Sequence, residues 1–141
     1  MRSLGLDIGD RRIGVALSDP EGILASTFSV IERKDDSLAI KAIIDVVNQK
    51  EVGQIIVGLP RSLDGSLGWQ VEKVKQFIRR LRRYTKVPMD YRDERLTTVM
   101  ARRLRRMSGG KKGRGKGGDD AQAAAIILQS YLDESQQSEL T

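Results

Sequence analysis

Hydrophobic and polar residues follow two different periods along this chain, and each period predicts a class of element. Short runs of β-type residues predict five strands, at residues 2–8, 12–18, 26–32, 54–58 and 87–92. Only Gly9, Asp10 and Arg11 separate the first two runs, which indicates a hairpin. The fourth run is apolar throughout its centre and predicts a central, parallel strand.

Apolar residues at helical spacing predict the helices. Residues 35–37 supply N-cap candidates for a helix over 38–47, and Ser66 can cap a second helix that reaches Leu81. The apolar stripe of the second helix leaves the arginines at 79, 80, 82 and 83 facing mainly outward. Further helices are expected at 99–107 and 119–132. This order of elements predicts an α/β fold, a five-stranded mixed sheet flanked by helices.

The length of 141 residues favours one domain with a real core. We expect a single domain over residues 1–134, with a flexible, glycine-rich basic loop at 109–118 and a frayed tail at 135–141. No apolar run approaches the roughly 18 residues of a membrane span. The N-terminus enters a strand directly and lacks the layout of a signal peptide, so a cytoplasmic location without membrane contact is expected.

Composition narrows the possible chemistry. The chain has no cysteine and no histidine, which excludes disulfides, thiolate metal sites and histidine as a general base. The net charge of +6 is unevenly distributed: residues 73–116 hold 17 Lys and Arg against three acidic residues, whereas the rest of the chain carries −8. This concentration of positive charge favours a nucleic-acid partner over a merely solvated basic face.

Three acidic residues stand out by their context. Asp7 lies inside an apolar strand, on the face opposite Leu4 and Leu6. Glu94 ends another strand, and Asp120 opens an alanine-rich helix. Carboxylates held near a sheet are costly to desolvate unless a cation balances them, and Mg²⁺ or Mn²⁺ does so with oxygen ligands. These three residues are therefore candidate metal ligands and candidate catalytic residues for phosphodiester chemistry.

The candidates also have structural alternatives. Asp7 could accept hydrogen bonds from nearby amides at the end of its strand. Asp119 and Asp120 both suit the first turn of a helix, where the helix dipole favours negative charge. Because Asp120 shares a helix face with Ala124 and Ile127, we expect Asp119 to be the N-cap and Asp120 to be the ligand.

Basic residues beside these acids are candidate phosphate contacts. The candidate nucleic-acid-binding residues are Arg11, Arg12, Arg95, Lys111, Lys112, Arg114 and Lys116. The last four belong to the loop at 109–118, which suits a phosphate-gripping flap better than a plain linker. The segment 58–66 leads from a strand into a helix N-terminus, and it is either an anion site or a simple connection.

Four sequence blocks together resemble the signature of one family. They are residues 4–19, Ile-Val-Gly-Leu-Pro (56–60) with Asp-Gly-Ser (64–66), Asp-Glu-Arg-Leu-Thr-Thr (93–98) and Asp-Ala-Gln-Ala-Ala-Ala-Ile-Ile-Leu-Gln (120–129). In this order, spanning nearly the whole chain, they resemble the YqgF/RuvX family. Its members are described as Holliday junction resolvases and as nucleases that trim the 5′ end of precursor 16S ribosomal RNA. The resemblance implies a ribonuclease H-like fold.

The resemblance also implies a cofactor. Asp7, Glu94 and Asp120 are expected to bind two Mg²⁺ or Mn²⁺ ions, with Asp7 bridging them. The classical resolvase has a fourth acid near its final helix, whereas this chain has Ala123 there. That difference disfavours tight binding of both ions.

The substrate and the alternatives follow from the same reasoning. RNA, including ribosomal precursor particles, is favoured over a DNA junction, because a junction resolvase needs a two-fold dimer and no patch marks an interface. The protein is expected to be a monomer or a homodimer. One alternative is a non-catalytic RNA-binding module, and another is an ATP-binding protein of the sugar kinase/actin type, which needs two such domains. The chain has six aromatic residues, several expected in the core, so base stacking is not expected to drive affinity.

Overall fold

The structure, a computed structural model, describes residues 1–59, 68–93 and 118–140, without the side chains of 118, 119 and 137–140. The strands are β1 (Arg2–Ile8), β2 (Arg12–Ser18), β3 (Ala25–Glu32), β4 (Val52–Leu59) and β5 (Met89–Asp93). The helices are α1 (Asp36–Gln49), α2 (Gly68–Leu81) and α4 (Gly118–Leu140). The helix predicted at 99–107 and residues 109–117 of the predicted basic loop lie outside the described residues.

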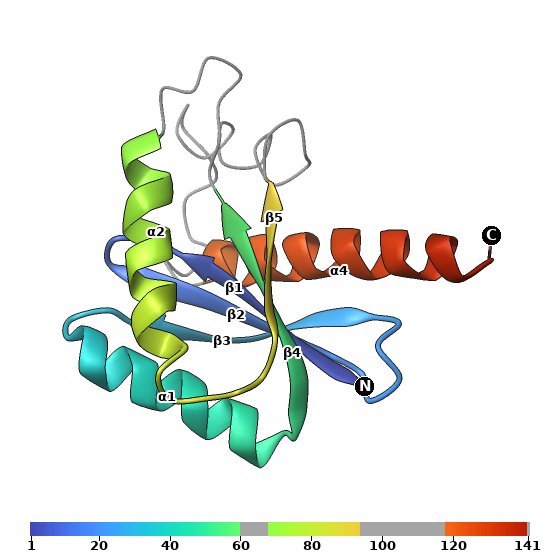
Figure 1. The fold of residues 1–141 in the computed structure, drawn as a ribbon, viewed down its shortest axis with the longest axis horizontal. Helices are drawn as coiled ribbons and strands as arrows, with labels where there is room; N and C mark the ends of the chain where they lie inside the picture. Colours follow the sequence, from blue (N-terminus) through green and yellow to red (C-terminus); the bar gives the residue numbers. More distant parts are fainter. Residues whose placement is uncertain (60–67, 94–117, 141) are drawn as a thin grey trace.

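The five strands form one mixed sheet in the order β3-β2-β1-β4-β5 (Figure 1). β1 and β2 form the predicted antiparallel hairpin, and β3 pairs with β2 in the same sense. β4 pairs with β1 and β5 pairs with β4, both in parallel. The strand at the fourth apolar run, β4, is therefore an interior strand parallel to both of its neighbours, although β1 rather than β4 is at the centre of the sheet, and the predicted five-stranded mixed sheet is confirmed.

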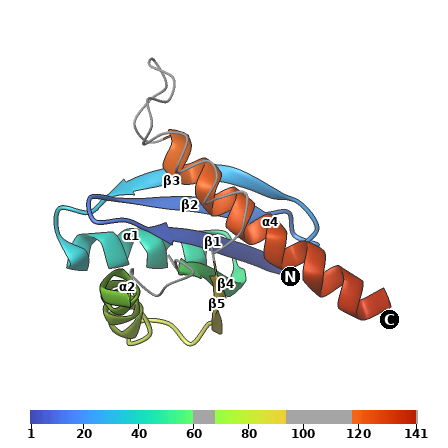
Figure 2. The ribbon, with the colours of Figure 1, turned by 90° about the horizontal axis from the view of Figure 1, so that it is seen from above.

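Helices cover both faces of this sheet. Figure 2 shows α1 and α2 on one face and α4 on the other. Leu4 and Leu6 pack into the core beneath α1 and α2, whereas Ala16 and Ile56 pack against α4. Because side chains alternate along a strand, Asp7 lies on the α4 face, opposite Leu6, as the sequence predicts.

The start of α1 follows the predicted capping logic. Asp35 has an extended backbone, and its carboxylate accepts hydrogen bonds from the amides of Ser37 (2.7 Å) and Leu38 (3.4 Å). In α2 the residues Val74, Ile78 and Leu81 are buried at helical spacing, together with Phe77. The four arginines at 79, 80, 82 and 83 are exposed, as predicted.

Most element boundaries differ from the sequence prediction by one or two residues, and two of the differences have a visible physical reason. β5 begins at Met89 rather than at 87, because Pro88 has no amide hydrogen and contributes only its carbonyl, which accepts from the amide of Ile55. α4 continues past the predicted end at 132 to Leu140. Residues 133–140 contain no glycine or proline to end the helix, and Glu134 forms an ion pair with Arg92 of β5. Within the described residues, no helix is long and apolar enough to cross a membrane.

Candidate active site

Asp7 is a buried carboxylate in the second-to-last position of β1. Its side chain is on the α4 face, and the residue is only 5% exposed. It pairs across the hairpin with Gly14 of β2, so the neighbour on that side has no side chain. This position fits the prediction that Asp7 lies within a strand with open backbone around it.

α4 approaches the sheet so closely that glycine is required beneath it. A Cβ atom added to Gly14 would lie 1.9 Å from the carbonyl oxygen of Asp120, and one added to Gly5 would lie 2.9 Å from that of Ala124. Neither contact is sterically possible without a shift of the helix. Because Gly14 is the partner of Asp7, this contact puts the backbone of Asp120 next to the strand pair that carries Asp7.

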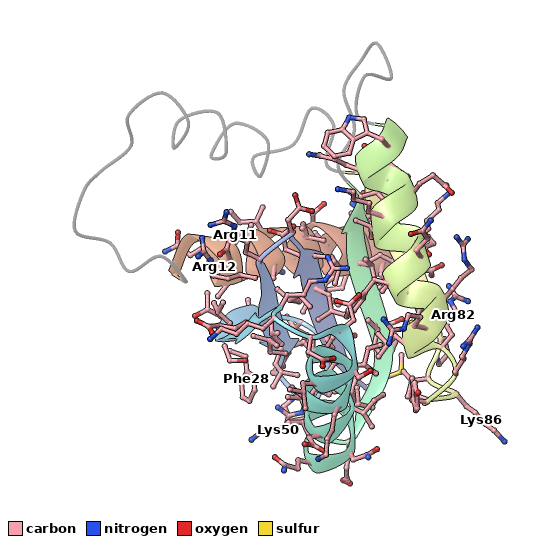
Figure 3. The ribbon with its side chains drawn as sticks, turned by 90° about the vertical axis from the view of Figure 1, so that its left-hand side faces the viewer. Arg11, Arg12, Phe28, Lys50, Arg82 and Lys86 are labelled. Carbon is pink, nitrogen blue, oxygen red and sulfur yellow. The ribbon has the colours of Figure 1, made fainter. Side chains whose placement is uncertain are left out.

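Asp120 of α4 and Arg12, the first residue of β2, form an ion pair. The Nε atom of Arg12 donates to Oδ2 of Asp120 at 2.8 Å, and the two side chains are 36% and 18% exposed. Figure 3 shows Arg12 and its neighbour Arg11 beside the start of α4. The sequence predicted a phosphate contact for Arg12 but not this pair, since 108 positions separate the two residues and no local pattern connects them.

The helix face that carries Asp120 agrees with the prediction. Ala124 and Ile127 are buried in the cluster that α4 forms with the sheet, and Tyr131 packs against it. Ala123 also belongs to this buried cluster, so its position is filled by apolar contacts. The expected face of the final helix is thus the one that contacts the sheet.

The third predicted acid follows β5. Leu6 of β1 and Tyr91 of β5 both pair with Val57 of β4, so the carboxyl ends of the three parallel strands point to the same edge of the sheet. β5 ends at Asp93, and Glu94 lies outside the described residues. Its assignment as a ligand therefore remains a prediction.

Most of the predicted phosphate contacts also remain predictions. Arg11 is exposed in the turn between β1 and β2. The candidates outside the described residues are Arg95, Lys111, Lys112, Arg114 and Lys116. The segment 60–67, which includes most of the predicted anion loop, also lies outside them, and so do the Oδ atoms of the expected N-cap at 119.

The donors present suit a hard divalent ion. Asp7 and Asp120 offer carboxylate oxygens, the ligands that Mg²⁺ and Mn²⁺ prefer, and the chain has no softer histidine or cysteine ligand. In the part of the chain that the structure describes, no three acidic side chains form a metal-binding group. A complete site on this face therefore needs a further ligand, and the prediction supplies it from Glu94.

Comparison with known proteins places the chain in a family. Residues 1–134 match the RuvX family, which is described as Holliday junction resolvase. The chain belongs to the RuvX family. The match covers all the described elements except the last turns of α4, and it confirms the resemblance of the four sequence blocks.

Curated relatives agree over nearly the full chain. A protein of Caldanaerobacter subterraneus subsp. tengcongensis is 44% identical over 98% of this chain and 100% of its own length. One of Halothermothrix orenii is 45% identical over 94% of both chains, and one of Trichormus variabilis is 40% identical over 93% of this chain and 87% of its own. All three carry the name "Putative pre-16S rRNA nuclease".

Solved structures show the same fold at low identity. RuvC of T. thermophilus in complex with a Holliday junction substrate superposes with a TM-score of 0.60 at 14% identity, covering 98% of this RuvX chain and 97% of RuvC. The fowlpox virus Holliday junction resolvase has a TM-score of 0.54 at 12% identity, covering 95% of this chain and 99% of its own. These resolvases have a ribonuclease H-like fold, so the predicted fold class is confirmed.

Proposed function

We propose that this RuvX protein is a metal-dependent nuclease that hydrolyses nucleic-acid phosphodiesters. The observation that carries the proposal is the seating of α4 on Gly14, which brings Asp120 to the face and the strand pair that hold the buried Asp7. The carboxylate oxygens of these two residues are the ligands that a hard divalent ion prefers. Family membership supports the same class of reaction.

Asp7, Glu94 and Asp120 are the proposed metal ligands, and Mg²⁺ or Mn²⁺ is the proposed ion. Such an ion, when bound, supplies the positive charge that lowers the pKa of an attacking water and neutralises a leaving oxygen. A second ion is part of the proposal, although Ala123 offers no fourth carboxylate. Asp7 is the ligand with the firmest support, because burial keeps competing water away from it.

The basic residues have two proposed roles. Arg12 orients the carboxylate of Asp120, to which it donates a hydrogen bond. Arg11 is exposed in the turn and binds a phosphate of the substrate from there. The remaining proposed phosphate contacts are Arg95, Lys111, Lys112, Arg114 and Lys116. Together they supply the positive charge that a polyanionic substrate needs.

Precursor 16S ribosomal RNA, cut at its 5′ end, is the proposed substrate. The names of the curated relatives support it. The second candidate is a four-way DNA junction, which the description of the family favours. A junction resolvase acts as a two-fold dimer, so dimerisation of the purified protein would favour the DNA substrate.

The decisive experiment compares cleavage of the two substrates by purified protein in Mg²⁺ and in Mn²⁺. Asp7→Asn, Glu94→Gln and Asp120→Asn should each remove cleavage and leave the fold intact, because each keeps the shape of the side chain and removes one charge. Asp90→Asn is the matched control, since Asp90 is an exposed acid in β5. Full activity of a folded Asp7→Asn protein would refute the proposal.

A non-catalytic RNA-binding module is the alternative within the same fold. It would bind RNA in a salt-dependent manner and show no cleavage with either metal. Neutralising the four cations Lys111, Lys112, Arg114 and Lys116 should lower the slope of log affinity against log salt by roughly 3–4 units on a duplex, if all four contact phosphates. An unchanged slope would make that segment a linker.

A further inference from the structure

An exposed tryptophan lies at the start of α2, near the edge of the sheet where the proposed chemistry takes place. Trp69 is the second residue of α2 and is 55% exposed. In Figure 1 the upper end of α2, where Trp69 lies, is at the same side of the molecule as the arrowheads of β4 and β5. Tryptophan is on average a highly buried residue, so an exposed tryptophan at this edge indicates a binding role.

Lys73 connects Trp69 to the hairpin that carries the proposed site. Its Nζ atom lies 4.9 Å from the centroid of the Trp69 ring, a cation–π geometry, and 4.0 Å from Oδ1 of Asp10. Asp10 is in the turn that follows β1, three residues after Asp7. The indole is thus held beside the turn, with more than half of its surface still accessible.

A polar cavity of about 410 Å³ continues from Lys73 along α2. Lys73, Gln76 and Arg80 line it from α2, and Asp10, Arg33 and Asp36 line it from the opposite side. Trp69, Lys73, Gln76 and Arg80 follow each other at intervals of four, three and four residues, so they form one stripe of the helix. This stripe extends for about 16 Å along the helix axis.

The two α2 cations in the cavity are held only weakly. Arg80 contacts Asp36 at 3.3 Å and donates to Oγ of Ser37 at 3.2 Å, and Lys73 contacts Asp10 at 4.0 Å, with all four charged side chains about a third exposed or more. Ion pairs of this kind contribute little free energy in water, so a phosphate can compete for either cation. By contrast, Arg33 is 14% exposed and donates hydrogen bonds to both Asp36 and the Gly9 carbonyl, so it is less available to a phosphate.

The charge of α2 favours nucleic acid over protein as the partner of Trp69. From residue 72 to 83 the helix and the residues just after it carry six Lys and Arg against one Glu. Figure 3 shows Arg82 and Lys86 directed outward at the far end of this helix. Among the described residues, Tyr84 is the other large exposed aromatic near α2, and it lies beyond the opposite end of the helix. A lone aromatic among cations is typical of a base-stacking position, whereas protein interfaces need a continuous apolar patch.

We infer that Trp69, Lys73 and Arg80 form a binding site for a short unpaired stretch of the substrate, with one base stacked on the indole, its phosphate held by Lys73 and a phosphate farther along the strand held by Arg80. The inference rests on the proposed function for its substrate class and adds that the bound segment is single-stranded next to the site of cleavage. It also assigns to stacking a contribution that composition alone did not suggest.

The chain offers a direct test, because Trp69 is its single tryptophan. Titration with a single-stranded oligonucleotide of about ten nucleotides, in EDTA to prevent cleavage, should quench the tryptophan fluorescence. A duplex of the same length should quench it much less at equal saturation, since its bases are already stacked. Binding without quenching, or equal quenching by the duplex, would overturn the inference.

Variants measured by anisotropy of a labelled oligonucleotide complete the test. Trp69→Ala should weaken single-strand binding by roughly 5- to 150-fold, Trp69→Phe should retain most of the affinity, and Tyr84→Ala, the exposed control, should change nothing. Unchanged affinity of Trp69→Ala would refute the inference and leave the indole as a surface for a protein partner.

The outcomes separate this inference from the proposed function. If the protein cleaves neither substrate, but the oligonucleotide quenches its fluorescence and Trp69→Ala weakens binding, the stacking site is supported and the nuclease is refuted. If cleavage depends on Asp7 but the single-stranded oligonucleotide leaves the fluorescence unchanged, the nuclease is supported and the stacking site is refuted.

Discussion

The two faces of the sheet are packed by different means. On the face of α1 and α2, large side chains such as Phe77, Ile78 and Leu6 fill the space between helix and sheet. On the other face, α4 presents alanines in its first turns and larger residues such as Ile127 and Leu128 further along, and its backbone touches the sheet at Gly5 and Gly14. The first arrangement buries more apolar volume, and the second brings the backbone of Asp120 onto the strand pair that carries Asp7. Stability and proposed chemistry are therefore expected to depend on opposite faces.

The largest stability effect is expected on the face of α1 and α2. Phe77→Ala removes a fully buried ring and should lower the free energy of unfolding by about 3–5 kcal/mol. Urea denaturation measures this loss, and Tyr84→Ala, an exposed aromatic beyond the end of the same helix, should stay within about 0.5 kcal/mol of the wild type. Phe77 also lines the cavity beside Lys73 and Arg80, so KM can rise, but kcat per folded molecule should be unchanged. If folded Phe77→Ala protein were inactive, the two faces would not be separable.

Gly14→Ala should disrupt the packing of α4 on the other face of the sheet. The new Cβ would collide with the carbonyl of Asp120, so α4 must shift, at a cost of about 1–3 kcal/mol or more, and Asp120 must move away from Asp7. Cleavage should fall far more than stability, which a parallel assay and denaturation curve would show. Gly53→Ala is the matched control, because the close contacts of its Cβ are with the flexible side chain of Met1, and the nearby backbone oxygen of Arg2 is at an ordinary 3.8 Å. A fully active Gly14→Ala protein would mean that the close packing of α4 on Gly14 is not required for cleavage.

Arg12→Ala and Arg11→Ala compare two neighbouring arginines, one at the start of β2 and one in the turn before it. Arg12→Ala removes the hydrogen bond to Asp120, but the pair is partly exposed, so the loss of stability should not exceed about 1 kcal/mol. Cleavage should decrease more than in Arg11→Ala, because Arg12 also orients Asp120 whereas Arg11 can act only on the substrate. Equal kcat and KM values for the two variants would assign both arginines to phosphate binding.

Asp36→Asn should have the smallest effect on stability. The hydrogen bond from Arg33 lowers the pKa of Asp36 below its ordinary value of 3.8, and the nearby positive charges of Arg33 and Arg80 act in the same direction. The ionised form therefore stabilises the fold above the ordinary value, and this contribution is lost as the pH falls through the lowered pKa. Thermal unfolding from pH 7 down to about pH 2 should show a shallower acid dependence for Asp36→Asn. Asp45→Asn, in an exposed pair with Lys41, serves as the control.

Particular residues show how far the sequence could predict the site. The placement of Asp7 on the face opposite Leu4 and Leu6 needs only the two-residue period of a strand, and it is confirmed. The contact face of α4 follows from helical spacing in the same way. The extension of α4 to Leu140 was missed, because its polar residues are weak signals until Glu134 meets Arg92 in the folded chain. Glu94 remains a prediction that the fold neither supports nor contradicts.

The sequence by itself determined the elements, their buried faces and the family, because these depend on spacing and motifs within short stretches of chain. The pairing of Arg12 with Asp120 and the need for glycine at position 14 were decided only by the tertiary structure. Both depend on where α4 crosses the sheet, and that crossing is set by the combined packing of residues more than 100 positions apart. Local patterns carry no information about such a contact, so the seating of Asp120 on Gly14 and its pairing with Arg12 become visible only once the whole chain is folded.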